Sequence, residues 1–514
     1  MSFGSLQVNT QEAPPIAAEG RPAATSGRAS SGMFHALAWT GTATWTTQLI
    51  TWAYTIIVAR MLQPSDYGLI GMASVPLGFL MIASEFGIGT AVVAMPDLPE
   101  DQISQLNTVA VISGVVLFAL ACVTAYPLGH FFRAPDLPLV VITLSLILVI
   151  TSFKTVPDAL LQREFCFKLL AQIQAAQAVS YAVAAVAAVL LGARYWSLVI
   201  ASLAGVTAST LLVLRSRPHA FAWPKLPALR PSLVFSTHVL GLRVAWYCNA
   251  TADFVVAGRV LGAAALGSYN VAWTIAEQPL QKFTDLVTRV VPPYFSRVQN
   301  NDAALRGYVL TITQSLSLLT LPATLGLALV ADDFVTAVLG PKWANSVLPL
   351  RILAVYSAVR AITSFFTPLL NTRGQSRFVM WNHILAALAF TAAFYLGSRW
   401  GIVGIALVWP LLYPFTVIPL FIRMINDLKL PLHTYVSSLF PALSGSLIMI
   451  VSLLILKSVI PARAIHARLA IEIGAGAAIY CVTIAGLYPG QLRRIYTLIR
   501  PATQAAPLAA ERPV

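Results

Sequence analysis

Charged residues are scarce in this 514-residue chain. Only 10% of its residues are Asp, Glu, Lys or Arg, whereas 58% are hydrophobic. Soluble globular domains carry about 25% charged residues, so a water-soluble protein of this length could not solvate such a surface. Repeated apolar runs of about 20 residues instead indicate membrane-spanning helices. The composition therefore predicts an all-α polytopic membrane protein.

Several other features are missing, and each absence excludes a class of protein. The four cysteines have no paired spacing and the seven histidines no ligand spacing, so neither disulfides nor a metal site is expected. There is no Walker A motif, and we expect no bound cofactor. Residues 1–32 lack an apolar core near their start, which favours a disordered cytosolic tail over a signal peptide.

Acidic residues are outnumbered, since 33 Lys and Arg face 19 Asp and Glu, for a net charge of +14. In a membrane protein this excess is typical of cytosolic loops, and it also favours an anionic ligand over a nucleic acid. Counting cations in the short loops predicts that both termini are cytosolic. The outer-side cluster of Lys457, Arg463 and Arg468 runs against that orientation.

Apolar runs predict about fourteen spans, with two six-helix lobes and two extra helices. The predicted spans lie near 35–58, 68–93, 105–129, 137–160, 169–192, 195–214, 233–258, 266–288, 308–331, 348–371, 378–397, 402–422, 436–457 and 468–488. The predicted divisions are an N-lobe at 33–214, a cytosolic basic linker loop at 215–231, a C-lobe at 232–425, two additional helices at 426–490 and a cytosolic tail at 491–514.

Short motifs recur in the two lobes at equivalent places. Arg60-x-Leu62-x5-Gly68 returns as Arg259-x-Leu261-x5-Gly267, and Leu-Pro-Leu at 137–139 returns at 348–350. Thr-Ser-Phe follows each at 151–153 and 363–365. Six helices per lobe preserve the in/out sense, so the repeats are parallel and pseudo-twofold. Transporters built this way place their substrate path between the halves.

Polar side chains inside the spans mark candidate cavity positions, because they are costly in lipid. A hydroxyl stripe follows the first span, where helix packing is an alternative explanation; it includes Thr44, Thr47 and Thr51, with Gln48 beside it. In the tenth span, Arg360 and Ser364 share one face, while Arg351 lies on the opposite face near the interface. Lys154 and Asp158 in the fourth span are spaced to pair.

The seventh and eighth spans carry acids and amides near mid-membrane. Asn249 and Asp253 share a face, and Glu277 lies on a polar stripe. A buried carboxylate there could accept a proton and couple transport to an ion, whereas pairing with Arg243 or Lys282 is the structural alternative. Glu85 is a weaker coupling candidate nearer an interface.

Two stretches resemble a known family. Leu62-Gln-Pro-Ser-Asp-Tyr-Gly-Leu-Ile-Gly-Met-Ala-Ser74 with Glu85-Phe-Gly-Ile-Gly89, and Pro293-Tyr-Phe-Ser-Arg297, resemble bacterial polysaccharide flippases. These are the Wzx-like members of the multidrug/oligosaccharidyl-lipid/polysaccharide exporter superfamily. The resemblance implies a bacterial inner-membrane protein with two lobes around a cationic cavity that opens alternately to each side. Its candidate cations are Arg60, Arg243, Arg259, Lys282 and Arg360.

The resemblance further implies a substrate, an undecaprenyl-pyrophosphate-linked oligosaccharide repeat unit flipped without bond chemistry. Bilayer lipids, a polysaccharide polymerase and glycosyltransferases are the expected partners. Two other hypotheses stay open. A cation-coupled multidrug antiporter should favour an acidic cavity, against which the mid-span cations count. A membrane polymerase or glycosyltransferase needs a long outer loop with catalytic acids, and Asp332-Asp333 at a span end is a poor metal motif.

Overall fold

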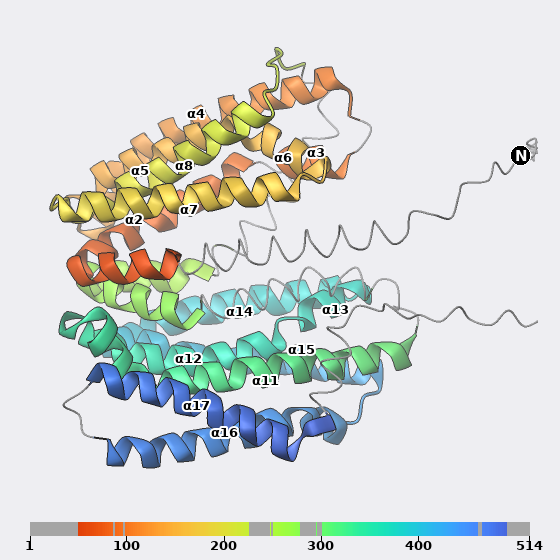
Figure 1. Cartoon of the computed structure of the whole chain (residues 1–514). Helices are drawn as coiled ribbons and strands as arrows, with labels where there is room; N and C mark the ends of the chain where they lie inside the picture. Colours follow the sequence, from red (N-terminus) through yellow and green to blue (C-terminus); the bar gives the residue numbers. More distant parts are fainter. Residues whose placement is uncertain are drawn as a thin grey trace, which may run out of the picture.

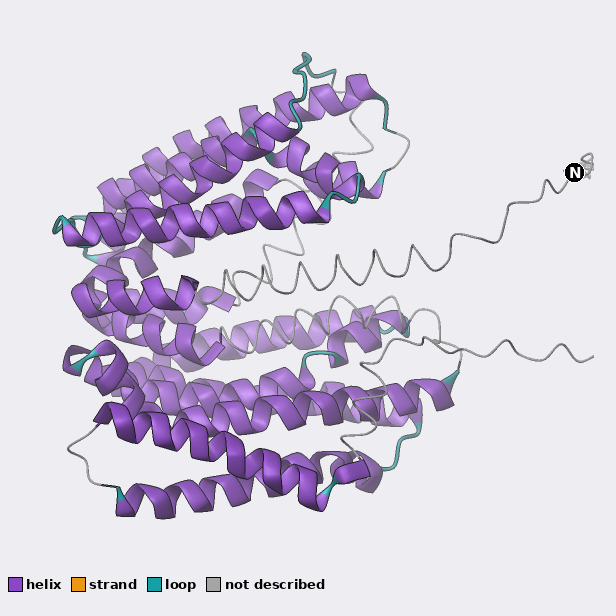
Figure 2. Cartoon of the chain, viewed as in Figure 1, coloured by secondary structure: helices purple, strands orange, loops and turns teal. Residues whose placement is uncertain are grey.

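A computed structural model describes residues 50–85, 88–95, 98–225, 247, 250–277, 295, 301–460 and 465–490. Every regular element in those ranges is helical, which confirms the all-α prediction (Figure 2). Nine of the described helices, or ten if a bent pair counts as one span, are long and apolar enough to cross a membrane. The count of fourteen stays a prediction, because parts of the chain lie outside the described residues. So do both predicted tails and residues 226–231 of the linker.

Two helix groups make up the fold (Figure 1). The N-terminal group comprises helix Ile50–Met61, α2 (Pro64–Glu85), α3 (Ile88–Ala94), α4 (Glu100–Phe132), α5 (Leu137–Ser152), α6 (Thr155–Arg163), α7 (Phe167–Leu190) and α8 (Trp196–Ser216).

The C-terminal group begins with helical residues 250–256 and 263–277, on either side of the π-helical turn η1 (Ala257–Leu261). It continues with α11 (Asp302–Phe334), η2 (Val335–Leu339), η3 (Pro341–Ser346), α12 (Val347–Thr363), α13 (Phe366–Thr372), α14 (Ser376–Gly397), η4 (Ser398–Trp400), α15 (Gly401–Leu428), α16 (Leu432–Val459) and α17 (Ile465–Leu487).

The two groups meet at one end of the bundle, called here the contact end. It carries the turns at 62–63, 133–136, 191–195, 262, 340 and 398–400. Prolines begin several helices there, including Pro64 of α2, Pro138 of α5 and Pro341 of η3. A proline suits the first turn of a helix, because the backbone N–H it lacks would have no helical partner at that position.

Both groups contain a broken span at the recurring Thr-Ser-Phe motif. In the first, α5 ends at Ser152 and α6 begins at Thr155, with a bend of 45°. In the second, α12 ends at Thr363 and α13 begins at Phe366. The predicted span at 137–160 is therefore a bent pair of helices, whereas the predicted span at 348–371 lies within one membrane-length stretch, Pro341–Thr372, that contains the second break. Lys154 at the first break donates to Ser209 Oγ at 2.9 Å, while Asp158 accepts from Gln162 at 3.0 Å, so the expected Lys154–Asp158 pair does not form.

The predicted linker loop is partly a packed segment. Arg215 and Ser216 still belong to α8, and residues 217–225 run over the beginning of α4. Ala222 N donates to Ser104 O at 3.3 Å, and Lys225 N donates to Gln105 Oε1 at 2.9 Å. Arg217 forms an ion pair with Glu164 at 2.8 Å. The two backbone contacts with Ser104 and Gln105 thus give buried polar groups in the first turns of α4 hydrogen-bond partners.

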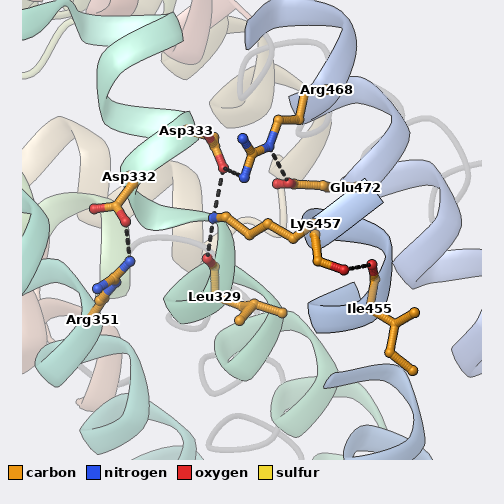
Figure 3. Close-up of polar contacts among 9 residues, drawn as sticks. Leu329, Asp332, Asp333, Arg351, Ile455, Lys457, Arg468 and Glu472 are labelled. Carbon is orange, nitrogen blue, oxygen red and sulfur yellow. Dashed lines mark hydrogen bonds and ion pairs between the residues drawn. The ribbon is translucent and has the colours of Figure 1, made fainter. Parts of the chain in front are cut away.

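The last two helices pack on α11, and an ion network joins them at the contact end (Figure 3). Asp333 lies 2.7 Å from Lys457 Nζ and 3.6 Å from Arg468 Nη2. Arg468 Nε also donates to Glu472 at 3.0 Å, and the Glu472 side chain is only 1% exposed. Two of the three cations that run against the predicted orientation, Lys457 and Arg468, are thus paired with carboxylates.

Asp332, one residue earlier on α11, forms an ion pair with Arg351 of α12 (Figure 3). Arg351 was expected to extend to the membrane interface, and it instead has a carboxylate partner. The Asp332-Asp333 pair therefore faces cations on three other helices. That arrangement explains why two adjacent acids stand at this span end.

Candidate functional site

Asp253 is buried inside the C-terminal group and is 0% exposed. Tyr269 Oη donates to its Oδ2 at 2.6 Å, and Trp409 Nε1 donates to the same oxygen at 3.3 Å. Phe254 N donates to Oδ1 at 2.9 Å. Within the described residues this carboxylate forms no ion pair, so its polar needs are met by neutral donors. The alternative partners Arg243 and Lys282 lie outside the described residues.

Glu277 is the second buried acid, with a side chain 5% exposed. Ser357 Oγ donates to its Oε1 at 2.6 Å, and Arg360 forms an ion pair with its Oε2. Ser357 and Arg360 are one turn apart on α12, so both reach the same carboxylate. The Arg360 side chain is still 35% exposed. The sequence suggested Glu277 for ion coupling and Arg360 for substrate binding, and the structure brings the two into one contact.

Aromatic rings separate the two acids. The Trp409 ring lies 5.2 Å from Trp273 and 4.9 Å from Tyr356, measured between centroids. Tyr413 stands edge-on to Tyr356 at 5.1 Å, and its hydroxyl lies 2.9 Å from Thr363 Oγ1. Such rings offer both an apolar face and a few polar tips. The site therefore combines two carboxylates, one partly exposed guanidinium and a wall of aromatic rings.

Arg60 lies elsewhere, at the contact end. Its Nε donates to Val338 O at 2.6 Å, and Nη2 donates to Ala337 O. In return, Lys342 Nζ donates to Arg60 O at 2.7 Å, and the buried Trp343 donates to Ala59 O at 2.9 Å. Arg60 therefore joins the end of the first helix to η2 and η3 of the other group.

Two glycines let the groups approach even more closely. A Cβ atom on Gly68 of α2 would lie 1.7 Å from Ala263 O, and one on Gly267 would lie 1.7 Å from Pro64 O. Neither position can hold a side chain unless the helices separate. These are the two glycines at matching offsets in the Arg-x-Leu-x5-Gly repeat. The recurring motif thus marks a backbone-to-backbone crossing of the two groups.

The other predicted residues are dispersed or lie outside the described residues. Arg259 lines a contact-end pocket, and Ser364 Oγ donates to Ala361 O at 2.8 Å beside the α12–α13 break. Of the hydroxyl stripe, Thr51 and its next member Thr55 are described, and Thr55 Oγ1 donates to Thr51 O at 2.7 Å. The structure does not describe the side chains of Thr44, Thr47, Gln48, Glu85, Arg243, Asn249 and Lys282.

The sequence did not predict several of the residues that surround Asp253 and Glu277. Tyr269 and Trp409 read as ordinary apolar residues of their spans, and α15 carries three internal prolines that interrupt any pattern. Ser357 is the residue that the sequence does indicate, because it lies one turn before Arg360 on the same polar face of the tenth span. Contacts such as Asp253–Trp409 join residues 156 positions apart, which no local pattern reveals.

Comparison with known proteins places this arrangement among polysaccharide-related membrane proteins. An uncharacterized membrane protein in the cps region of Klebsiella pneumoniae is 26% identical over 380 residues, covering 72% of this chain and 77% of that protein. The teichuronic acid biosynthesis protein TuaB of Bacillus subtilis is 28% identical over 328 residues, 62% of this chain and 68% of its own. The lipopolysaccharide biosynthesis protein WzxC of Escherichia coli is 25% identical, covering 68% and 72%.

Two solved structures share the fold. The lipid II flippase MurJ, in an inward closed conformation, superposes with a TM-score of 0.71 at 13% identity, covering 88% of this chain and 99% of MurJ. An inward-facing multidrug resistance MATE family transporter of the MOP superfamily gives a TM-score of 0.54 at 16% identity, covering 73% and 94%. Residues 57–348, more than half of the sequence, match the family described as polysaccharide biosynthesis protein, and the chain therefore belongs to that family.

Proposed function

We propose that this chain flips undecaprenyl-pyrophosphate-linked oligosaccharide repeat units across the bacterial inner membrane, without making or breaking bonds. The observation that carries the proposal is a MurJ-like fold in a member of a polysaccharide biosynthesis family. The product would enter a surface polysaccharide, exopolysaccharide or lipopolysaccharide. Glycosyltransferases would act before this flipping step, and a polymerase would act after it.

The proposed mechanism is alternating access between the two helix groups. Contacts between the groups gather at the contact end, through Arg60, Trp343 and the glycine crossing. With both termini cytosolic, the contact end faces outward, so this state would be closed to the outside. Translocation then requires the Gly68–Gly267 crossing and the contacts of Arg60 with η2 to separate. The opposite ends of the two helix groups would at the same time approach each other.

Arg360 is the proposed phosphate ligand within the C-terminal group. Its guanidinium is partly exposed, and arginine offers paired N–H donors to phosphate oxygens. A pyrophosphate bound there would compete with Glu277 for the same cation. A buried carboxylate left without its cation is costly. Glu277 is therefore the proposed coupling site, with Ser357 holding its carboxyl group in place.

The decisive test is deletion of the gene in its host. We expect loss of the surface polysaccharide and accumulation of its lipid-linked repeat unit on the cytosolic side, measured by lipid extraction and labelling in spheroplasts. Complementation with the wild-type gene should restore export. Normal export in the deletant contradicts the proposal.

A drug antiporter is the competing function, since the MATE-like fold is shared. The same deletant separates the two possibilities. Raised drug sensitivity with intact polysaccharide would favour the antiporter. The ion-paired Arg360 beside the aromatic wall fits an anionic substrate better than a cationic drug.

A further inference from the structure

Two adjoining cavities at the contact end have contrasting linings. The anion pocket has a volume of about 410 Å³, and its lining includes Asp66, Arg133, Asp136, Arg194 and Arg259. The apolar groove has a volume of about 580 Å³, and its lining includes Val75, Phe79, Leu120, Thr124 and Val255. Phe132 lines both cavities, so the charged cavity and the apolar groove are neighbours.

Arg259 is the residue that calls for a ligand. Its Nη1 is buried and has no hydrogen-bond partner in the described part of the chain. Its guanidinium lies over the Phe131 ring at 5.3 Å, a contact that leaves the N–H donors unused. Leaving a buried donor unsatisfied is costly, and more so for a charged group. An anion entering the pocket would satisfy it.

The remaining charges around the pocket also leave it positive, because its three arginines outnumber the two carboxylates of Asp66 and Asp136. Asp66 is already engaged, since its Oδ2 accepts from Gln63 N at 2.9 Å and its Oδ1 lies 3.4 Å from Arg194. Among the described residues, neither Arg133 nor Arg259 forms an ion pair. The pocket also lies at the N-termini of α2, α5 and α8, and of residues 263–277. Helix N-termini add positive potential and free N–H donors.

The apolar groove is accessible from the bilayer. Phe79 and Leu120 on its wall are 40% and 46% exposed. The groove lies between α2 and α4 of one group and the residues 251–256 and Thr391 of the other. An occupant with a charged head and a hydrocarbon chain would therefore contact both helix groups at once.

We propose that these cavities form an outer release site for the polyprenyl pyrophosphate carrier, with its pyrophosphate on Arg259 and Arg133 and its chain in the apolar groove. This inference rests on the proposed function. Two guanidiniums without ion pairs match the charge of a pyrophosphate better than the single charge of a phosphodiester. The single apolar groove fits the one hydrocarbon chain of the carrier. The site is distinct from Arg360, so the flipped carrier would pass from one cation to another.

The test measures binding of undecaprenyl pyrophosphate to the purified full chain by native mass spectrometry. Arg259→Gln should weaken binding about tenfold, because it removes a charge-assisted contact. Leu120→Trp, which fills the groove from its exposed wall, should weaken it similarly. Arg399→Gln, at an exposed contact-end arginine outside the pocket, is the matched control for charge. Val123→Trp, one turn along α4 and outside the groove, is the control for bulk.

Three competitors identify the occupant. Undecaprenol, which lacks phosphate, and inorganic pyrophosphate, which lacks the chain, should each displace the carrier poorly. If phosphatidylglycerol displaces it at equal concentration, the occupant is a bilayer phospholipid and the assignment to the carrier is overturned. Unchanged binding in both Arg259→Gln and Leu120→Trp would overturn the site itself.

The outcome is separable from that of the proposed function. If Arg259→Gln weakens carrier binding but deletion of the gene leaves export normal, the results support the site and contradict the flippase function. If deletion of the gene abolishes export but carrier binding is unchanged in Arg259→Gln and Leu120→Trp, the results support the flippase function and contradict the site.

Discussion

At the scale of single residues, the ion pair between Glu277 and Arg360 gives the sharpest test of the proposed mechanism. Arg360→Ala removes the proposed phosphate ligand and leaves a buried carboxylate without its cation. We expect export to fall by about tenfold or more, from the loss of a charged hydrogen bond. Arg360→Lys should recover part of it, because lysine keeps the charge but not the paired donors.

The matched control for this variant lies on the same helix. Arg351→Ala also removes an ion-paired arginine, but from Asp332 near the helix start. Surface polysaccharide should stay near wild type in that variant, with protein levels followed by immunoblot in both. Equal export in Arg360→Ala and Arg351→Ala would assign Arg360 a purely structural role.

His219 in the packed linker provides a second residue-scale prediction. Burial lowers its pKa below the ordinary value of 6.5, with Glu100 opposing and Arg217 reinforcing that shift. The folded loop therefore disfavours the protonated ring. The contribution of His219 to the stability of the folded loop is fully present above pH 6.5, and it is lost as the pH falls through the lowered pKa.

Hydrogen exchange of residues 217–225 measures this effect. We expect the protection factors, which correct for the pH dependence of intrinsic exchange, to be lower below that pH window than above it, and to be independent of pH in His219→Gln. A pH-dependent profile that persists in His219→Gln would show that another group controls the loop.

At the scale of helices, the network around Asp333 determines how α16 and α17 are held. Asp333→Asn leaves Lys457 without its carboxylate in a half-buried setting. Removing one partner of a buried ion pair costs about 3 kcal/mol. We expect a lower thermal unfolding midpoint in detergent and greater thiol-reagent access to a cysteine placed on the α11-facing side of α17. Asp332→Asn, whose side chain is 49% exposed, should shift the midpoint much less.

The same helices show what sequence could and could not predict. Apolar length placed α16 and α17 within a few residues, because a span must match the bilayer. It did not reveal the network, since Asp333 and Lys457 are 124 positions apart and meet only after folding. Counting loop cations likewise did not reveal that Lys457 and Arg468 pair with buried carboxylates. The breaks after Ser152 and Thr363 were missed because the two residues between the helices do not interrupt the long apolar run from which a span is predicted.

At the scale of the whole molecule, the glycine crossing controls which state the protein occupies. Gly68→Ala places a methyl group where Ala263 O lies, so the two groups must separate at the contact end. Spin labels on Leu191 and Trp400, in a cysteine-free background, report that separation because both positions are exposed at this end. We expect a longer and broader distance distribution in Gly68→Ala.

Gly307→Ala is the control, because a Cβ there meets no atom within 4 Å. An unchanged distance in Gly68→Ala would mean that the crossing does not hold the groups together. The repeat motif indicated that these glycines were equivalent, but only the structure shows that they face each other.

That pairing bears on the history of the chain. In a duplicated six-helix unit, Gly68 and Gly267 descend from one position, and in a homodimer of that unit they would have met across the twofold axis. A single substitution in that unit would then have changed both sides of the glycine crossing at once. In the fused chain each glycine mutates alone, yet either change suffices to force the helices apart. Relatives that keep this close approach should therefore retain glycine at both positions, and those that lost one should show the other free to drift.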